Sequence, residues 1–220
     1  MTTATPPPTG STPRLRADAA RNRAQILAAA RTAFRELGTA APLDEIARRA
    51  EVNIATLYRR FPDRDALVRQ VVVDGLNVLG EAVQRALDAA RADALSAIEQ
   101  LLMDMVNARE TLILPLIGGP TTDDAEAAEV QRENAARIEE ILSLARTQGT
   151  VRDDATAVDV IAAGAMACRP MPYIPSEQAA AIATRHMRIF IDGLRPPQGP
   201  PLLPEAPTAD QLFANLRTTD

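Results

Sequence analysis

The chain has 220 residues and a formal net charge of −5, with 46% hydrophobic and only 3% aromatic residues. It can bury a core of aliphatic side chains and methionine, and its single cysteine, Cys168, excludes an intramolecular disulfide. No apolar run follows a basic start, so we expect neither a secretory signal nor a membrane-spanning helix, and a cytoplasmic protein.

The charge is unevenly distributed along the chain. Residues 1–70 hold twelve Arg against seven Asp and Glu, whereas residues 71–220 hold twelve Arg against twenty-two acidic residues. The overall acidity argues weakly against a nucleic-acid partner. The positive first third nevertheless has the charge that neutralisation of phosphates requires.

Helical periodicity without strand-like alternation predicts an all-α fold. Residues 1–13 and the Pro-rich segment after residue 195 cannot bury apolar surface, so we expect disorder at the first and an irregular tail at the second, with one short helix possible near 209–216. Glycines and prolines mark the breaks between helices. The predicted helices span about 18–37, 43–50, 54–60, 64–91, 93–109, 111–117, 123–148, 155–168 and 176–194.

Two short helices separated by a tight polar turn are predicted between Pro42 and Phe61. Each has apolar residues on one side only, and Val52 closes the corner between them. The apolar positions are Leu43, Ile46, Ala47 and Ala50 in the first helix and Leu57 and Phe61 in the second. The arrangement is typical of a helix-turn-helix.

The outer face of the second helix carries small, hydroxyl-bearing and cationic side chains. Such groups suit base edges and phosphates in a major groove. Asn53 is a good N-cap for this helix and, at its start, is a further DNA-binding candidate. The outer residues are Ile54, Ala55, Thr56, Tyr58, Arg59 and Arg60.

The order and spacing of these residues resemble the TetR family of transcriptional regulators, which commonly read Ile-Ala-x-x-Ala-Gly-Val-Ser-x-x-Thr-Leu-Tyr-x-x-Phe. Three positions depart from that pattern: Pro42 replaces a Ser or Thr whose hydroxyl contacts a phosphate, Glu51 replaces Gly, and Asn53 replaces Ser. A positive φ at residue 51 would cost Glu about 1 kcal/mol relative to Gly. The matching positions are Ile46-Ala47, Ala50, Val52, Thr56-Leu57-Tyr58 and Phe61.

The resemblance implies a homodimeric regulator of a double-stranded DNA operator, most simply a repressor released by a small molecule, without a cofactor. It implies a DNA-binding domain over 14–63 and a helical effector-binding and dimerisation domain over 64–195. By composition, a disordered tail over 1–13 precedes them and a Pro-rich tail over 196–220 follows them. Tyr58 would contact a phosphate, Thr56 a phosphate or a base edge, and Ile54, Ala55 and Arg59 the bases. Nearer the DNA backbone would lie Arg60 and Arg64.

Arginines before and within the first helix are further candidates. Arg16 and Arg23 could lie against phosphates or enter the minor groove. The alternative is that such charges only keep a terminal segment soluble.

The last two predicted helices carry the dimer hypothesis. Small apolar residues let helices approach closely, and family analogy places these helices in a four-helix bundle with a twofold mate. An ordinary intrachain core is the alternative for part of the set. The proposed interface residues are Val158, Ile161, Ala162, Ala165, Ile182, Met187 and Phe190.

A cavity for the effector is expected among the middle helices. Methionine adapts to ligands, and a polar Asn107 or Arg137 inside an apolar pocket would orient one. Core packing is the alternative for each residue. The candidates are Leu79, Val83, Met103, Val106, Asn107, Leu114, Arg137 and Met166.

Two other classes of function remain open at this stage. A thiol enzyme could use Cys168 as nucleophile, His186 as base and Asp192 as orienting group, although the spacing gives it little support. No residues stand at metal-ligand spacing, so no metal is expected. The second alternative is a helical ligand carrier or partner-binding protein with impaired DNA binding, as Pro42 and Glu51 would allow.

Overall fold

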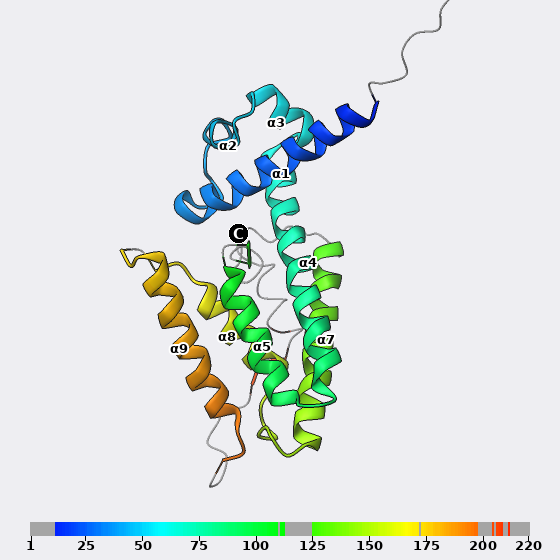
Figure 1. Ribbon diagram of the computed structural model, residues 1–220, viewed down its shortest axis with the longest axis vertical. Coiled ribbons are helices and arrows are strands. Elements are labelled where there is room, and N and C mark those ends of the chain that lie inside the picture. Colours follow the sequence, from blue (N-terminus) through cyan, green and yellow to red (C-terminus); the bar gives the residue numbers. More distant parts are fainter. Residues whose placement is uncertain are drawn as a thin grey trace, which may run out of the picture. The chain divides into compact units, whose positions relative to one another are not determined.

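The computed structural model describes residues 12–109, 111–112, 125–171, 173–197, 204, 206–208 and 211. All regular structure in these residues is helical, which confirms the predicted all-α fold (Figure 1). Most of the expected helix over 111–117 and most of the two expected tails lie outside the described residues. The helices are α1 (Thr12–Leu37), α2 (Leu43–Arg49), α3 (Ile54–Arg60), α4 (Arg64–Ala90), α5 (Ala94–Asn107), α7 (Ala125–Thr147), α8 (Ala157–Cys168) and α9 (Ser176–Leu194).

The first helix begins at Thr12, six residues earlier than periodicity predicted. Contacts divide the chain into two compact units, residues 1–67 and 68–220, and the division falls inside α4. None of the described helices combines the length and apolar character that crossing a membrane requires.

The first unit packs α1 against α2, and α2 against α3. Aliphatic side chains from all three helices fill its centre, together with two phenylalanines, so each short helix is held by one apolar side. The largest buried residues here are Ile26, Leu27, Phe34, Ile46, Leu57, Phe61 and Leu67.

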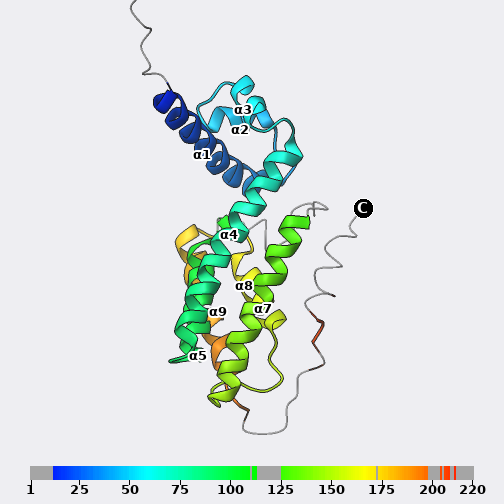
Figure 2. The same cartoon turned by 90° about the vertical axis from the view of Figure 1, so that its right-hand side faces the viewer.

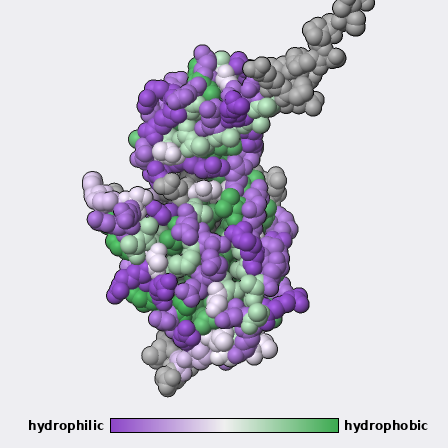
Figure 3. Space-filling model, viewed as in Figure 1, coloured by the Kyte–Doolittle hydropathy of each residue, from purple (hydrophilic) through white to green (hydrophobic). Residues whose placement is uncertain are grey.

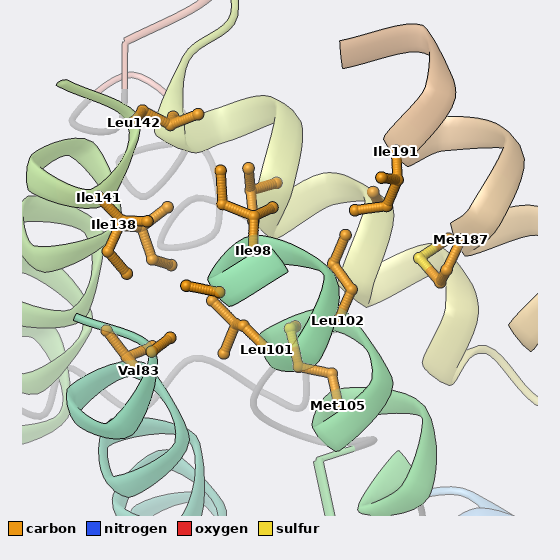
Figure 4. Packing of buried hydrophobic residues seen from close by; sticks show 14 of the residues in the cluster. Val83, Ile98, Leu101, Leu102, Met105, Ile138, Ile141, Leu142, Met187 and Ile191 are labelled. Atoms are coloured by element: carbon orange, nitrogen blue, oxygen red, sulfur yellow. The ribbon is translucent and has the colours of Figure 1, made fainter. Parts of the chain in front are cut away.

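The second unit is built around α5, which packs against α7, α8 and α9. Ile98, Leu101, Leu102 and Met105 of α5 lie at the centre of the apolar cluster (Figure 4). Side chains of α4 and α7 meet them from one direction and side chains of α9 from another. Figure 2 shows α4 and α7 running side by side. Surrounding residues labelled in Figure 4 are Val83, Ile138, Ile141, Leu142, Met187 and Ile191.

The centre of this unit admits one especially close helix contact. A Cβ added at Gly164 of α8 would stand 1.9 Å from Cε and 2.7 Å from Sδ of Met105. The absence of a side chain at Gly164 therefore makes room for the methionine of α5.

Local side-chain chemistry defines the ends of several helices. Asp93 caps α5 by accepting from the Ser96 amide at 3.0 Å, so the chain breaks here between two helices. The side chain of Gln148, just after α7, accepts from the amide of Ala94 at 2.9 Å and donates to the carbonyl of Ala90 at 2.9 Å. One amide group thus serves the last residue of α4 and the first residue of α5.

Candidate nucleic-acid interface

The turn between α2 and α3 is closed by a Schellman motif. The amide of Val52 donates to the carbonyl of Ala47 at 3.0 Å, and the amide of Glu51 donates to the carbonyl of Arg48 at 3.2 Å. This motif places one residue in the left-handed region, and that residue is Glu51, with φ of 54°. Glu51 therefore occupies the conformation that favours glycine.

The start of α3 is fixed by Asn53, as predicted. Its Oδ1 accepts from the amide of Ala55 at 2.8 Å. Leu57 is fully buried and Phe61 nearly so. Because two buried side chains and a cap hold α3, its opposite face is presented on a rigid support.

The residues predicted to contact DNA occupy that opposite face. Ala55, Tyr58, Arg59 and Arg60 are exposed, and Tyr58 keeps half of its surface accessible. The remaining two, at positions 54 and 56, are half-buried. The face therefore offers a methyl group, a phenol, a hydroxyl and two guanidinium groups.

One hydrogen bond orders part of this face. Nη2 of Arg59 donates to Oγ1 of Thr56 at 2.7 Å. Arg60 makes no comparable bond with any described residue and projects from the last turn of α3. The two neighbouring arginines therefore differ in how firmly their guanidinium groups are held.

An ion-pair network lies on α2. Glu45 accepts from Arg48 at 2.7 Å and 2.8 Å and from Arg49 at 2.7 Å. Arg49 also donates to Glu36 at the end of α1, at 2.7 Å. Hydrogen bonds from Arg48 and then Arg49 lower the pKa of Glu45 to about 2. These two arginines are thus paired with carboxylates, in contrast to the arginines of α3.

Two of the other predicted phosphate contacts have partners within the first unit. Nη1 of Arg64 donates to the carbonyls of Thr39, at 2.9 Å, and Ala41, so this side chain ties the start of α4 to the loop before α2. The guanidinium of Arg23 lies 5.6 Å from the centre of the Phe61 ring, a cation–π distance. Arg16 lies on α1, and its side chain is outside the described residues.

A cavity of about 310 Å³ opens in the second unit along α4 and α5. Its lining includes an ion pair in which Nη2 of Arg85 donates to Oδ2 of Asp104 at 2.9 Å. Among the predicted effector residues, Asn107 lines this cavity. The lining is Val78, Ala82, Arg85, Asp104, Met105, Asn107, Ala108 and Leu112.

The other effector candidates lie elsewhere in the unit. Leu79, Val83 and Val106 are buried in the apolar cluster, and Met103 packs against it. Met166 is exposed on α8. Arg137 lies on α7, where it forms an ion pair with Glu133 at 3.3 Å. Leu114 lies outside the described residues.

The helical periodicity of the sequence did not predict that the polar side chain of Asn134 would be buried in this unit. Asn134 of α7 is only 2% exposed, and its Nδ2 donates to the carbonyl of Leu76 at 3.4 Å. A Cβ at Gly80 would stand 3.2 Å from Oδ1 of Asn134, so Gly80 leaves space for the amide. Neither Asn134 nor the Arg85–Asp104 pair has a signal in the sequence, because polar residues on an amphipathic helix normally face solvent.

The predicted dimer residues divide between the core and the surface. Val158 and Met187 are buried within the chain. The half-buried members are Ile161, Ala162, Ala165, Ile182 and Phe190. Two further apolar side chains of these helices are exposed, Met166 at 66% and Ile189 at 57%. Figure 3 shows hydrophobic areas interrupting a largely hydrophilic surface on the face in view.

The residues of the alternative thiol triad have other partners. Cys168 is buried, burial raises the pKa of its thiol to about 12, and Sγ lies 3.5 Å from the carbonyl of Met105. His186 is exposed, with Nδ1 3.0 Å from the carbonyl of Ile182, and Asp192 lies 3.7 Å from Arg195. A thiol with so high a pKa is a poor nucleophile at neutral pH.

Comparison with known proteins identifies the class to which this fold and this helix-turn-helix belong. The family model of bacterial regulatory proteins of the tetR family matches residues 26–71, which include α2 and α3. The model of the SbtR-like transcriptional regulator C-terminal domain matches residues 92–196. The chain therefore belongs to the TetR family of DNA-binding transcriptional regulators, which are generally not enzymes.

Solved structures with the same fold include regulators from several bacteria. A TetR regulator from Streptomyces coelicolor is 27% identical, covers 79% of this chain and 98% of its own, and has a TM-score of 0.56. PfmR from Thermus thermophilus is 19% identical, with coverages of 77% and 98% and a TM-score of 0.61. AibR in complex with isovaleryl coenzyme A and operator DNA is 19% identical, with coverages of 80% and 99% and a TM-score of 0.62. A search of the curated proteins finds no significant match.

Proposed function

We propose that the chain is a cytoplasmic transcriptional repressor that binds a pseudo-palindromic operator as a homodimer and leaves it when a small molecule binds. The observation that carries this proposal is the outer face of α3, where Tyr58, Arg59 and Arg60 are exposed on a helix fixed by Asn53 and Leu57. Residues 14–63 would form the DNA-binding domain, and residues 64–195 would bind the effector and the second subunit.

The shortness of α3 favours a homodimer on physical grounds. One helix of seven residues makes few base contacts, whereas two copies about 34 Å apart would contact successive major grooves on one side of the DNA. The exposed Met166 and Ile189 and the half-buried small residues of α8 and α9 supply apolar surface for a mate. Val158 and Met187 would support this surface from within the chain.

A small-molecule effector has support from the cavity and from one structural neighbour. The cavity of about 310 Å³ has apolar walls, with Asn107 and an ion pair to orient a ligand. The neighbour AibR holds isovaleryl coenzyme A and operator DNA in one complex. Exposing the operator-bound protein to a panel of small molecules, with loss of fluorescence anisotropy as the readout, would identify the effector.

DNA binding is tested by selecting genomic fragments with purified protein and measuring their affinity by fluorescence anisotropy at several salt concentrations. We expect a palindromic site and a steep fall of affinity with salt, by about 0.9 logarithmic units per phosphate contact. Affinity that is equally weak on every sequence would refute the proposal and favour the ligand-carrier or partner-binding alternative.

Variants of α3 sharpen this experiment. Arg59→Ala should relax preference at one base pair, by about 1–3 kcal/mol if it reads a guanine. Tyr58→Phe should weaken binding to all sequences alike. Arg91→Ala removes an exposed arginine of the second unit and is the matched control for loss of charge.

A further inference from the structure

The hydrogen bond between Arg59 and Thr56 fixes where the guanidinium of Arg59 lies. Side chains on a helix lean toward its N-terminus. Here Nη2 of Arg59 donates to Oγ1 of Thr56, one turn earlier, at 2.7 Å. The charged end of a long side chain from the last turn of α3 is thereby held beside the first half of the helix.

That half of α3 is the part which a helix-turn-helix presents to base edges. Ala55, the exposed neighbour of Thr56, carries only a methyl group and leaves space there. An arginine has five N–H donors, and the bond to Thr56 takes one of them. The remaining donors are enough for the paired hydrogen bonds by which arginine recognises O6 and N7 of guanine.

We propose that Thr56 is a positioning residue that holds the guanidinium of Arg59 in place for a guanine of the operator. This inference rests on the proposed function. Thr56 then contributes to base preference through Arg59 and not through a base contact of its own. A side chain that is ordered before binding loses less conformational freedom when it binds. This smaller entropic cost favours the correct base, because only there does Arg59 form its paired hydrogen bonds.

Arg60 provides an internal comparison. It is exposed on the same turn, and no hydrogen bond or ion pair holds it among the described residues. Arg60→Ala should lower affinity on all sequences and reduce the salt slope by about one. The fixed arginine would read sequence, whereas its neighbour would contribute charge.

The test compares Thr56→Val, Thr56→Ser, Arg59→Ala and the double variant Thr56→Val/Arg59→Ala. Valine keeps the branched shape and removes the hydroxyl, and serine keeps the hydroxyl. Affinities are measured by anisotropy on the selected operator and on versions with each base pair replaced, at several salt concentrations. Circular dichroism melting checks that each variant folds.

We expect Thr56→Val to reduce discrimination about two- to tenfold at the base pair that Arg59→Ala affects, with an unchanged salt slope. Thr56→Ser should retain discrimination, and the double variant should match Arg59→Ala. Losses that multiply in the double variant, or an equal loss on every sequence for Thr56→Val, would overturn the inference while the proposed function stands. A wild-type protein without a preferred site would overturn both.

Discussion

Replacing Glu51 with glycine should stabilise the first unit. Glu51 has φ of 54° in the turn before α3, and a left-handed conformation costs an L-residue about 1–2 kcal/mol. Glycine avoids that cost but loses roughly 0.5–1 kcal/mol through its greater freedom in the unfolded chain. The expected net gain for Glu51→Gly is therefore about 0.5–1 kcal/mol in the free energy of unfolding.

Urea denaturation followed by far-ultraviolet circular dichroism measures this gain. With a slope of about 1–3 kcal/mol per molar urea, the midpoint should rise by roughly 0.2–1 M. Glu51→Ala removes the same carboxylate but keeps the strained backbone, so it should stay within about 0.5 kcal/mol of the wild type.

Gly149 supplies the opposite experiment. It has φ of 67° after α7, and a Cβ added there meets no atom within 4 Å. Gly149→Ala should therefore lower the free energy of unfolding by about 1 kcal/mol through the backbone alone.

Equal stabilisation by Glu51→Ala and Glu51→Gly would refute the reasoning, because the carboxylate and not the left-handed backbone would then be responsible.

Three further changes test other contacts. Two arginines lower the pKa of Glu45 from 4.5 to about 2, so the stabilisation that the charged Glu45 gives the folded protein is full above pH 4.5 and lost as the pH falls toward 2. The free energies of unfolding in urea of the wild type and Glu45→Gln should therefore converge over that range. A constant difference between them would contradict this. Gly164→Ala should cost about 1–2 kcal/mol, because the new Cβ meets the adaptable Met105 side chain, whereas Gly193→Ala, with open space around its Cβ, should not lower the melting temperature. Burial raises the pKa of the Cys168 thiol to about 12, so in the folded protein it should react slowly with iodoacetamide at pH 8, and in urea it should react rapidly. Fast labelling of the folded protein would show that the thiol is accessible.

The helix-turn-helix was predictable because its signals are local. A cap such as Asn53 acts within two residues, and the apolar spacing around Leu57 identifies the buried side of α3. Even the departure at Glu51 was informative, since the turn pattern indicates which position has a positive φ. The family follows from the same short stretch.

The cavity was much less predictable. Periodicity identifies residues that face inward, but it does not separate those that line a space from those that fill the core. Val83 and Val106 pack in the apolar cluster, whereas Asn107, on the same helix as Val106, lines the cavity. The Arg85–Asp104 pair joins residues nineteen positions apart, and such a pairing depends on how two helices pack.

The hydrogen bonds of the Gln148 side chain affect how the second unit unfolds locally. Its side chain joins the end of α4, the start of α5 and the chain just after α7 through bonds of 2.9 Å to Ala90 and Ala94. Separate helix ends usually fray independently, with amide protons that exchange at unrelated rates. Here the three ends share one amide group, so opening at one of them weakens the hydrogen bonding that holds the other two. The turn at Ala90–Ala94 and the last turn of α7 should therefore open as one cooperative segment.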